Sequence, residues 1–424
     1  MPALPGDLCQ LTRMWKFYGQ LFAGLPREVW LLSLVTFVQR SGTMVLPFLT
    51  LYLTQRQGFT VQGAGGILSL YGIGAIVGSY VGGWCSDRIG AVRTQIVSLC
   101  LATGALVTLS QMRSPLSIIV VVLLWSIAAE SMRPANGAAL AEMSPPHLHA
   151  RVFGLRRLSM NLGMSIGPAV GGFVVTWSYN VLFMIEASMA LLAAGLLWGL
   201  LPSGGQHARS TPPDQTLSPE PASLPQSPWR DGVFLAIVGL TTLLVTTLCQ
   251  LFGAYPLTLT EVHHFPAYAI GLVFTVNTLV IVVCQMPILH VVARFDTLRV
   301  IGVGAFFLCG GFALLPLGTT TGALIATVLV WTFGEMLTTP LLESFVATRS
   351  PVENRGQYMG LFSSAFSVAF VLAPLGGTWI YGRYGYLTLW GLCGLLGVGL
   401  WLAFFVLSTT VRGYDAGLTE GKVT

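Results

Sequence analysis

The stretch GGWCSDRIGAVRT, residues 82–94, places three charged side chains between two long apolar runs. The charges belong to Asp87, Arg88 and Arg93. An apolar run of about 17 to 25 residues is long enough to cross a bilayer as a helix. The stretch therefore indicates a short charged loop between two membrane-spanning helices.

Similar apolar runs recur along the whole chain. Of its 424 residues 54% are hydrophobic and 9% are charged, whereas charged residues make up about 25% of a typical soluble domain. These values predict an all-α polytopic membrane protein with twelve transmembrane helices. The expected spans are 29–53, 63–86, 95–112, 117–141, 153–176, 180–201, 232–256, 268–290, 300–318, 321–346, 357–380 and 386–408.

The basic residues predict the orientation. Sixteen of the 21 Lys and Arg residues fall on one side of the predicted topology, three fall on the other, and Arg40 and Arg133 lie inside spans. Cytoplasmic loops carry the excess of basic residues, so both termini are predicted to be cytoplasmic. The net charge of +5 reflects this bias, and basic residues do not gather with aromatic ones as a nucleic-acid surface would require.

The two halves of the chain resemble each other at one offset. Adding 206 takes Arg88 to Arg294, and the same shift relates Pro134 to Pro340 and other Gly and Pro residues. A Pro- and Ser-rich stretch between the halves is typical of a flexible linker. The expected organisation is an N-terminal cytoplasmic segment (1–28), a six-helix bundle (29–202), a cytoplasmic linker (203–229), a second six-helix bundle (230–408) and a cytoplasmic tail (409–424).

The loop at 82–94 resembles the loop signature of the major facilitator superfamily. The matching residues are Gly83, Asp87, Arg88, Gly90 and Arg93. Glycine at 83 permits close helix approach, glycine at 90 permits a tight turn, and the Asp87 carboxylate can latch one conformation by accepting hydrogen bonds. The resemblance implies two six-helix bundles that move against each other around a central site.

The fifth span contains GMSIGPAVGG, residues 163–172. This pattern is similar to the antiporter motif of drug and proton exchangers within that superfamily. Its small residues allow neighbouring helices to pack closely, although close packing is common in membrane helices of any function. The residues that match the motif are Gly163, Gly167, Pro168, Gly171 and Gly172.

Charges inside the spans are candidates for function, because a buried charge in a bilayer is costly. Arg40 lies 12 residues after Glu28, about 18 Å along a helix and thus near the middle of the bilayer. Its expected partners are Glu130 and Glu335, and Arg133 shares a helix face with Glu130. In the superfamily the first, fourth, seventh and tenth spans line the cavity, which implies one site for all four charges.

Proton coupling is assigned to three carboxylates. Glu335 lies in FGEMLTTPLLESFVA, residues 333–347, which is similar to the tenth span of multidrug proton antiporters, and Glu142 matches an acidic position at the end of their fourth span. Glu130 is the third, and a structural ion pair with an arginine is the alternative role. Glu186 and Glu343 lie nearer span ends and rank as secondary candidates.

Uncharged residues on the expected lining spans complete the candidate cavity, although each is also a typical helix-packing residue. They are Gln39, Asn136, Gln250, Asn277 and Trp331.

The predicted function is proton-coupled export of small amphipathic or drug-like molecules. An uptake symporter for peptides, sugars or other small polar solutes is the alternative, although Thr36 and Gln39 stand where peptide transporters carry glutamates. No nucleophile–base pair or metal cluster suggests an enzyme or a cofactor. The expected partners are the substrate, protons and membrane lipids. A monomer in a plasma membrane, of the bacterial inner-membrane type, is expected.

Overall fold

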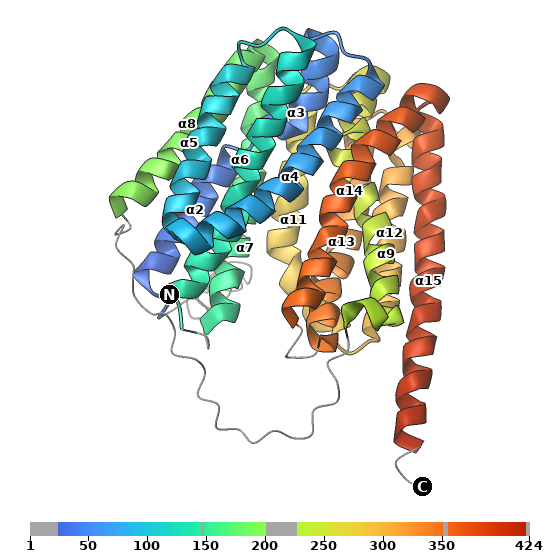
Figure 1. Cartoon of the computed structure of the whole chain (residues 1–424). Helices are drawn as coiled ribbons and strands as arrows, with labels where there is room; N and C mark the ends of the chain where they lie inside the picture. Colours follow the sequence, from blue (N-terminus) through green and yellow to red (C-terminus); the bar gives the residue numbers. More distant parts are fainter. Residues whose placement is uncertain (1–23, 146–147, 201–226, 351–354, 421–424) are drawn as a thin grey trace, which may run out of the picture.

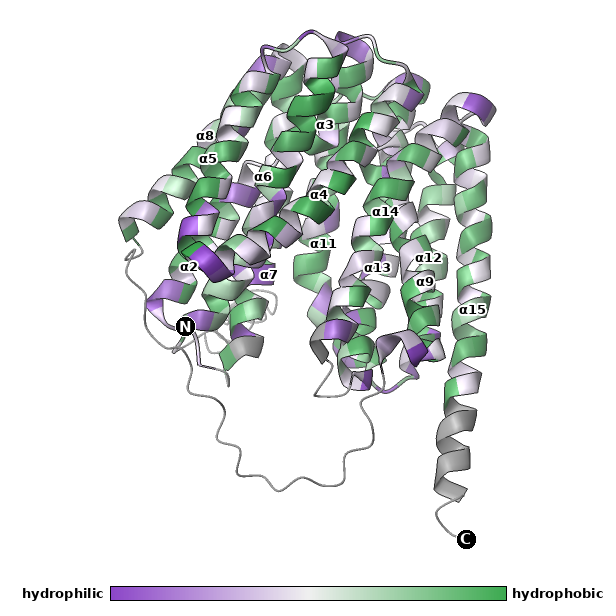
Figure 2. Ribbon diagram, in the orientation of Figure 1, coloured by the Kyte–Doolittle hydropathy of each residue, from purple (hydrophilic) through white to green (hydrophobic). Residues whose placement is uncertain are grey.

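The computed structural model describes residues 24–145, 148–200, 227–350 and 355–420. Twelve helical segments in these ranges are long and apolar enough to cross a membrane, and hydrophobic residues cover most of their length (Figure 2). The predicted fold class, an all-helical polytopic membrane protein, is confirmed. Most of the predicted N-terminal segment and of the predicted linker lies outside the described residues.

The first six spans form one group of helices and the last six form another (Figure 1). The elements of the N-terminal half are α2 (Arg27–Ser41), α3 (Val45–Leu51), the π-helix η1 (Tyr52–Arg56), α4 (Val61–Ile89), α5 (Ala91–Leu109), α6 (Pro115–Glu142), α7 (His149–Trp177) and α8 (Tyr179–Leu200). Those of the C-terminal half are η3 (Pro228–Arg230), α9 (Gly232–Leu248), η4 (Cys249–Leu251), α10 (Ala254–Leu257), the π-helix η5 (Thr258–Val262), α11 (Tyr268–Val292), α12 (Thr297–Ala313), η6 (Leu315–Leu317), α13 (Thr321–Arg349), α14 (Arg355–Tyr384) and α15 (Tyr386–Glu420).

We call the end of the molecule that holds Arg27 and Gly90 the base, and the end that holds Gly58 and Gly385 the apex. Because successive spans alternate in direction, α2 begins and α15 ends at the base (Figure 1). The termini of the described chain therefore lie on the same side of the membrane.

The helix boundaries follow the offset seen in the sequence. Helices α5, α6 and α7 begin 206 residues before α12, α13 and α14, respectively. The two π-helices, η1 and η5, show the same shift at both of their ends. The repeat therefore extends to backbone detail.

The first span of each half is interrupted, where the sequence suggested one continuous apolar run. In the N-terminal half α2 stops at Ser41 and α3 starts at Val45, and in the C-terminal half η4 separates α9 from α10. Gly42 and Gly253 lie at these two breaks. Both interruptions lie at membrane depth, where freed backbone groups require partners from the protein.

The two halves pack against each other mainly toward the apex. Helix α4 contacts α14, and the Ser69 hydroxyl donates to the Val371 carbonyl at 2.8 Å. Helix α7 contacts α11, where a Cβ added to Gly172 would lie only 2.7 Å from Tyr268 Cα. Helix α3 contacts α10, and the Thr50 hydroxyl of α3 donates to the carbonyl of Phe252, directly after η4, at 2.8 Å. These crossings bring backbones from the two halves into direct contact.

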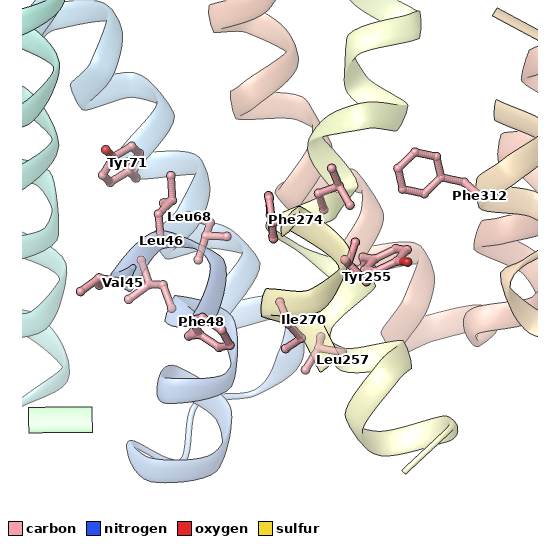
Figure 3. Packing of buried hydrophobic residues seen from close by; sticks show 14 of the residues in the cluster. Val45, Leu46, Phe48, Leu68, Tyr71, Tyr255, Leu257, Ile270, Phe274 and Phe312 are labelled. Carbon is pink, nitrogen blue, oxygen red and sulfur yellow. The ribbon is translucent and has the colours of Figure 1, made fainter. Parts of the chain in front are cut away.

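A buried apolar cluster fills the space between these crossings. It includes Val45 and Phe48 of α3, Leu257 of α10 and Ile270 of α11 (Figure 3). Each of the four is at most 1% exposed. The cluster excludes water from the interface between the halves on the apex side.

Candidate functional site

The first span is interrupted next to Arg40, which lies in the last turn of α2. The first N–H groups of a helix lack intrahelical partners, and no water replaces them inside a bilayer. Glu186 of α8 supplies a partner: its Oε2 accepts hydrogen bonds from the backbone N–H groups of Met44, at 2.8 Å, and Val45, at 2.7 Å. A buried carboxylate thus holds the start of α3 at the break.

Arg40, Glu130 and Arg133 meet at a small cavity that we call the Arg40 pocket. The Tyr71 hydroxyl of α4 donates to Glu130 Oε1 at 3.3 Å, and Arg133 Nη1 lies 3.5 Å from Glu130 Oε2. Arg40 acts electrostatically on Glu130 and Glu186. The volume of about 20 Å³ is enough for about one water molecule. The lining residues are Gln39, Arg40, Thr43, Leu46, Tyr71, Trp125, Ala129, Glu130, Met132, Arg133 and Glu186.

Glu335 does not line the Arg40 pocket. It belongs to a second polar group, the Glu335 cluster, which consists of Asn277 of α11 and Thr332 and Glu335 of α13. The Asn277 side-chain amide donates to Glu335 Oε2 at 2.9 Å and to the Thr332 hydroxyl at 3.1 Å. Three of the four charges that the resemblance implied at one site therefore line the Arg40 pocket, whereas Glu335 makes its hydrogen bonds within the C-terminal half.

Arg157 of α7 connects the Glu335 cluster with the other half. Its guanidinium acts electrostatically on Glu335, and its Nη1 lies 3.0 Å from Glu343 Oε2 of α13. Among the described residues this is the only Lys or Arg ion pair between the halves. Both side chains are more than two fifths exposed, so the pair is accessible to solvent.

The uncharged candidates divide into cavity and packing residues. Gln39 lines the Arg40 pocket. Asn136 is buried and donates to Gln95 Oε1 at 3.1 Å, so it joins α6 to α5. Gln250 donates to the Ala373 carbonyl at 2.9 Å, and Trp331 is fully buried and stacked on Phe312.

Glu142, the third carboxylate assigned to proton coupling, is the last residue of α6. Its side chain is exposed. It lies at the base, away from both polar groups.

The loop at 82–94 forms a turn of one residue. Gly90 joins α4 to α5 with φ +90°, a conformation that favours glycine. Asp87 and Arg88 are exposed, and the Arg88 guanidinium lies 4.4 Å from the ring centre of Trp84. Arg93 lies in the first turn of α5.

Close helix approach was predicted at Gly83, but the space around it is open. Gly82 makes the contact instead, because a Cβ there would lie 2.7 Å from Ser131 Cα of α6.

The glycines at 163–172 do form a closely packed helix face. A Cβ on Gly163 would lie 2.5 Å from Arg40 Cβ, and one on Gly167 would lie 2.8 Å from the Thr43 carbonyl oxygen. Gly171 faces Met44 of the broken span, whereas Gly172 faces α11 of the other half. Pro168 lies inside α7 with its carbonyl against α11. The motif therefore packs the break in span one.

A larger cavity lies away from these polar groups. It has a volume of about 540 Å³ and is enclosed by α4, α5 and α6. Its walls include Leu101 and Leu124, whose side chains are 60% and 56% exposed. Exposed apolar side chains on spanning helices face lipid tails rather than water, so we do not assign this cavity to the functional site.

The ion pair between Asp231 and Arg349 lies at the base of the C-terminal half. Asp231 caps α9 by accepting from the Phe234 backbone N–H at 3.0 Å, and Arg349 of α13 donates to both of its carboxylate oxygens at 2.8 Å. Burial opposes ionisation of this carboxyl, but the hydrogen bonds from Arg349, the Phe234 N–H and Tyr358, together with the charge of Arg349, outweigh it and hold the pKa of Asp231 below its usual range.

Sequence reasoning missed the roles of Glu186 and Arg157. Glu186 is the only acidic residue of α8, and a lone carboxylate in an apolar span indicates a functional or structural role. Arg157 gives no comparable signal, because it counts among the sixteen basic residues on the predicted cytoplasmic side.

Comparison with known families supports the architecture. The sequence model described as Major Facilitator Superfamily matches residues 29–341 and 235–423. A Na(+), Li(+), K(+)/H(+) antiporter of Planococcus maritimus is 24% identical over 378 residues, which are 80% of this chain and 86% of that protein. The multidrug resistance protein MdtH of Cronobacter sakazakii is 21% identical over 330 residues, which are 76% of this chain and 79% of that protein.

Solved structures share the same fold. A crystal structure of the peptide transporter POT in complex with sulfate aligns with a TM-score of 0.78 over 92% of this chain and 96% of that chain, at 15% sequence identity. An identity this low supports the fold alone.

Proposed function

Because the chain belongs to the major facilitator superfamily, we propose that it is a proton-coupled secondary transporter that exports small amphipathic or drug-like molecules by alternating access. The membership establishes an integral membrane protein of a transporter family. Proton coupling, export and the class of substrate are the parts that we propose.

The carboxylates Glu130 and Glu335 carry the proposal. They lie on α6 and α13, which correspond in the two halves, and each is partly buried and held by a neighbouring helix of its own half. The proton affinity of a carboxylate depends on its burial and on nearby cations. Movement of the halves changes both factors, so a proton can be bound on one side of the membrane and released on the other.

The packing of the halves supports alternating access. The apex is sealed by backbone contacts and apolar side chains, whereas an exposed ion pair between Arg157 and Glu343 joins the halves nearer the base. The positive-inside rule assigns the base to the cytoplasm, so we interpret this conformation as closed to the outside. One chain supplies both halves, and a monomer suffices.

The names of the relatives favour exchange for protons. One relative is called a cation/proton antiporter and another a multidrug resistance protein. Asp87 and Arg88 are exposed at the one-residue turn, where a latch to the other half can form. We also propose that the glycine face of α7, which packs the interrupted span next to Arg40, seals a leak path between the helices.

Uptake of peptides or other polar solutes remains the alternative, because a peptide transporter is among the solved structures of the same fold. The residues of span one give no further support to the uptake alternative. Thr36 donates to the Leu32 carbonyl at 2.8 Å, and Gln39 carries no acidic proton. The two positions that hold glutamates in the peptide transporters are therefore neutral here.

Transport in proteoliposomes under an imposed pH gradient tests the proposal. The probes are ethidium, tetraphenylphosphonium, neutral drugs and dipeptides, and the variants are wild type, Glu335→Gln and, as a control amide substitution at the base, Glu28→Gln. We expect ethidium or tetraphenylphosphonium to move against the proton flow in wild type and in Glu28→Gln. Glu335→Gln should lose this gradient-driven movement but keep probe binding.

Two outcomes would reject parts of the proposal. Movement of dipeptides together with the protons would replace export by uptake. Full gradient-driven transport by Glu335→Gln would remove Glu335 as the coupling carboxylate.

A further inference from the structure

We propose that Glu186 is a positioning residue that fixes the interruption of span one and thereby places Arg40 in its pocket. The inference rests on the proposed function only in taking the Arg40 pocket as the site that matters for transport. Its central observation is independent of substrate: one oxygen of a buried carboxylate accepts the backbone N–H groups of both Met44 and Val45.

Helix α8 holds the break from one side. Glu186 binds the start of α3, and Met189, one turn later on α8, packs against Gly42. A Cβ on Gly42 would lie 2.5 Å from Met189 Cβ, so only glycine permits this approach. The same turn of α8 therefore contacts both Gly42 at the break and the residues at which α3 starts.

Helix α7 holds the break from the opposite side. Gly163 faces Arg40 Cβ and the Ser41 backbone nitrogen, and Gly167 faces the carbonyl oxygens of Arg40 and Thr43. Bulkier residues at 163 or 167 would push this segment away. The backbone of Arg40 is thus clamped between a glycine face and a carboxylate cap.

The clamp determines which groups meet the Arg40 guanidinium. Tyr71, Glu130 and Arg133 face the pocket from α4 and α6, and Glu186 faces it from α8. The cap acts on the backbone that follows Arg40 and not on the guanidinium itself. It therefore holds the arginine in place independently of the contacts that Glu130 makes.

Two chemical readouts on the purified full chain test the inference without a substrate. Hydrogen–deuterium exchange monitors the peptide that contains Met44 and Val45. Peptide mapping after treatment with phenylglyoxal, an arginine reagent, gives the modification rates of Arg40 and Arg133, the latter as an internal control from the same pocket. The variants are Glu186→Ala, Glu186→Gln and Gly42→Ala, with Ser188→Ala on the exposed face of α8 as the control.

We expect Glu186→Ala to raise the exchange rate at 44–45 about tenfold, as loss of a local cap does, and to change the rate at Arg40 but not at Arg133. Glu186→Gln should largely restore both readouts, because an amide oxygen still accepts two hydrogen bonds. Gly42→Ala should change the exchange rate at 44–45 and the modification rate of Arg40 in the same direction as Glu186→Ala, since its methyl group displaces Met189.

The inference fails if Glu186→Ala leaves exchange at 44–45 unchanged. It also fails if Arg40 and Arg133 change equally, because that result describes general loosening of the bundle. Ethidium transport supplies a functional readout: Glu186→Ala should add no further loss in an Arg40→Gln background, and additive losses would contradict action through Arg40. If the wild type does not transport ethidium, the proposed substrate class fails, while exchange and modification still decide the role of Glu186.

Discussion

The Asp231–Arg349 pair allows a quantitative prediction for the C-terminal half. Asp231→Ala removes the cap of α9 and both carboxylate oxygens that Arg349 contacts at 2.8 Å. The Asp231 side chain is 8% exposed and that of Arg349 is 30% exposed. The substitution therefore leaves a largely buried guanidinium without its main partner.

The magnitude follows from these contacts. Hydrogen bonds to charged groups contribute about 1.5–3 kcal/mol each and an N-cap about 1 kcal/mol. Water partly replaces the partner of Arg349, so we expect a net loss of about 3 kcal/mol rather than the full sum. An unfolding entropy of about 2.1 cal/mol/K per residue over 424 residues converts this loss to a decrease in Tm of about 3 °C.

The assay is thermal unfolding in detergent, followed by intrinsic tryptophan fluorescence. Asp231→Asn is the matched variant, because it keeps an oxygen for the Phe234 N–H but loses the charge. Its decrease in Tm should therefore be about half that of Asp231→Ala. The pKa of Asp231 is lowered in the folded protein. Its stabilisation is therefore complete above the unfolded pKa of about 3.9 and is lost as the pH falls through the lower folded value.

Three results would refute this reasoning. One is an unchanged Tm in Asp231→Ala, and another is an equal decrease in the Ala and Asn variants. The third is a difference between wild type and Asp231→Ala that already disappears between pH 7 and pH 5.

Further substitutions test the contacts between helices. Gly167→Ala should destabilise the protein by about 1–3 kcal/mol through overpacking and thereby lower Tm and expression. Gly399→Ala is the control and should change neither, because no heavy atom lies within 4 Å of the added Cβ. Equal behaviour of the two variants would mean that α7 tolerates the methyl group. Arg157→Gln and Glu343→Gln should each change stability by less than about 1 kcal/mol, because the pair is exposed, yet alter the rate of ethidium transport; a large fall in Tm would instead indicate a structural pair.

The helical architecture was predictable because hydropathy and length alone determine which segments span a bilayer. The interruption of span one was not predictable in the same way. Residues 29–53 form a mostly apolar run, and the break depends on Glu186, which lies more than 140 residues away in the sequence. Periodicity reports the environment of a segment but not the distant group that caps it.

The sequence predicted the depth of the candidate residues in the membrane, but it did not predict how their side chains are arranged. The positions of Arg40 and Glu130 along their helices indicated the same membrane level, and both residues line one pocket. Glu335 has an equivalent depth but lies with Asn277 in the other half. Sequence spacing gives the height of a residue along its helix, whereas the separation of the halves depends on packing contacts such as that between Gly172 and Tyr268.

The paired π-helices occupy equivalent places in the two halves. A π-helix holds one residue more than the α-helical turn that it replaces, and η1 and η5 hold theirs at equivalent places, in YLTQR at 52–56 and TLTEV at 258–262. Only Leu and Thr are common to the two segments. The extra residue therefore recurs at the same place in both halves even though most of the side chains around it differ. Deleting one residue from either segment would rotate everything that follows by about 100°, so the packing of each half depends on its extra residue.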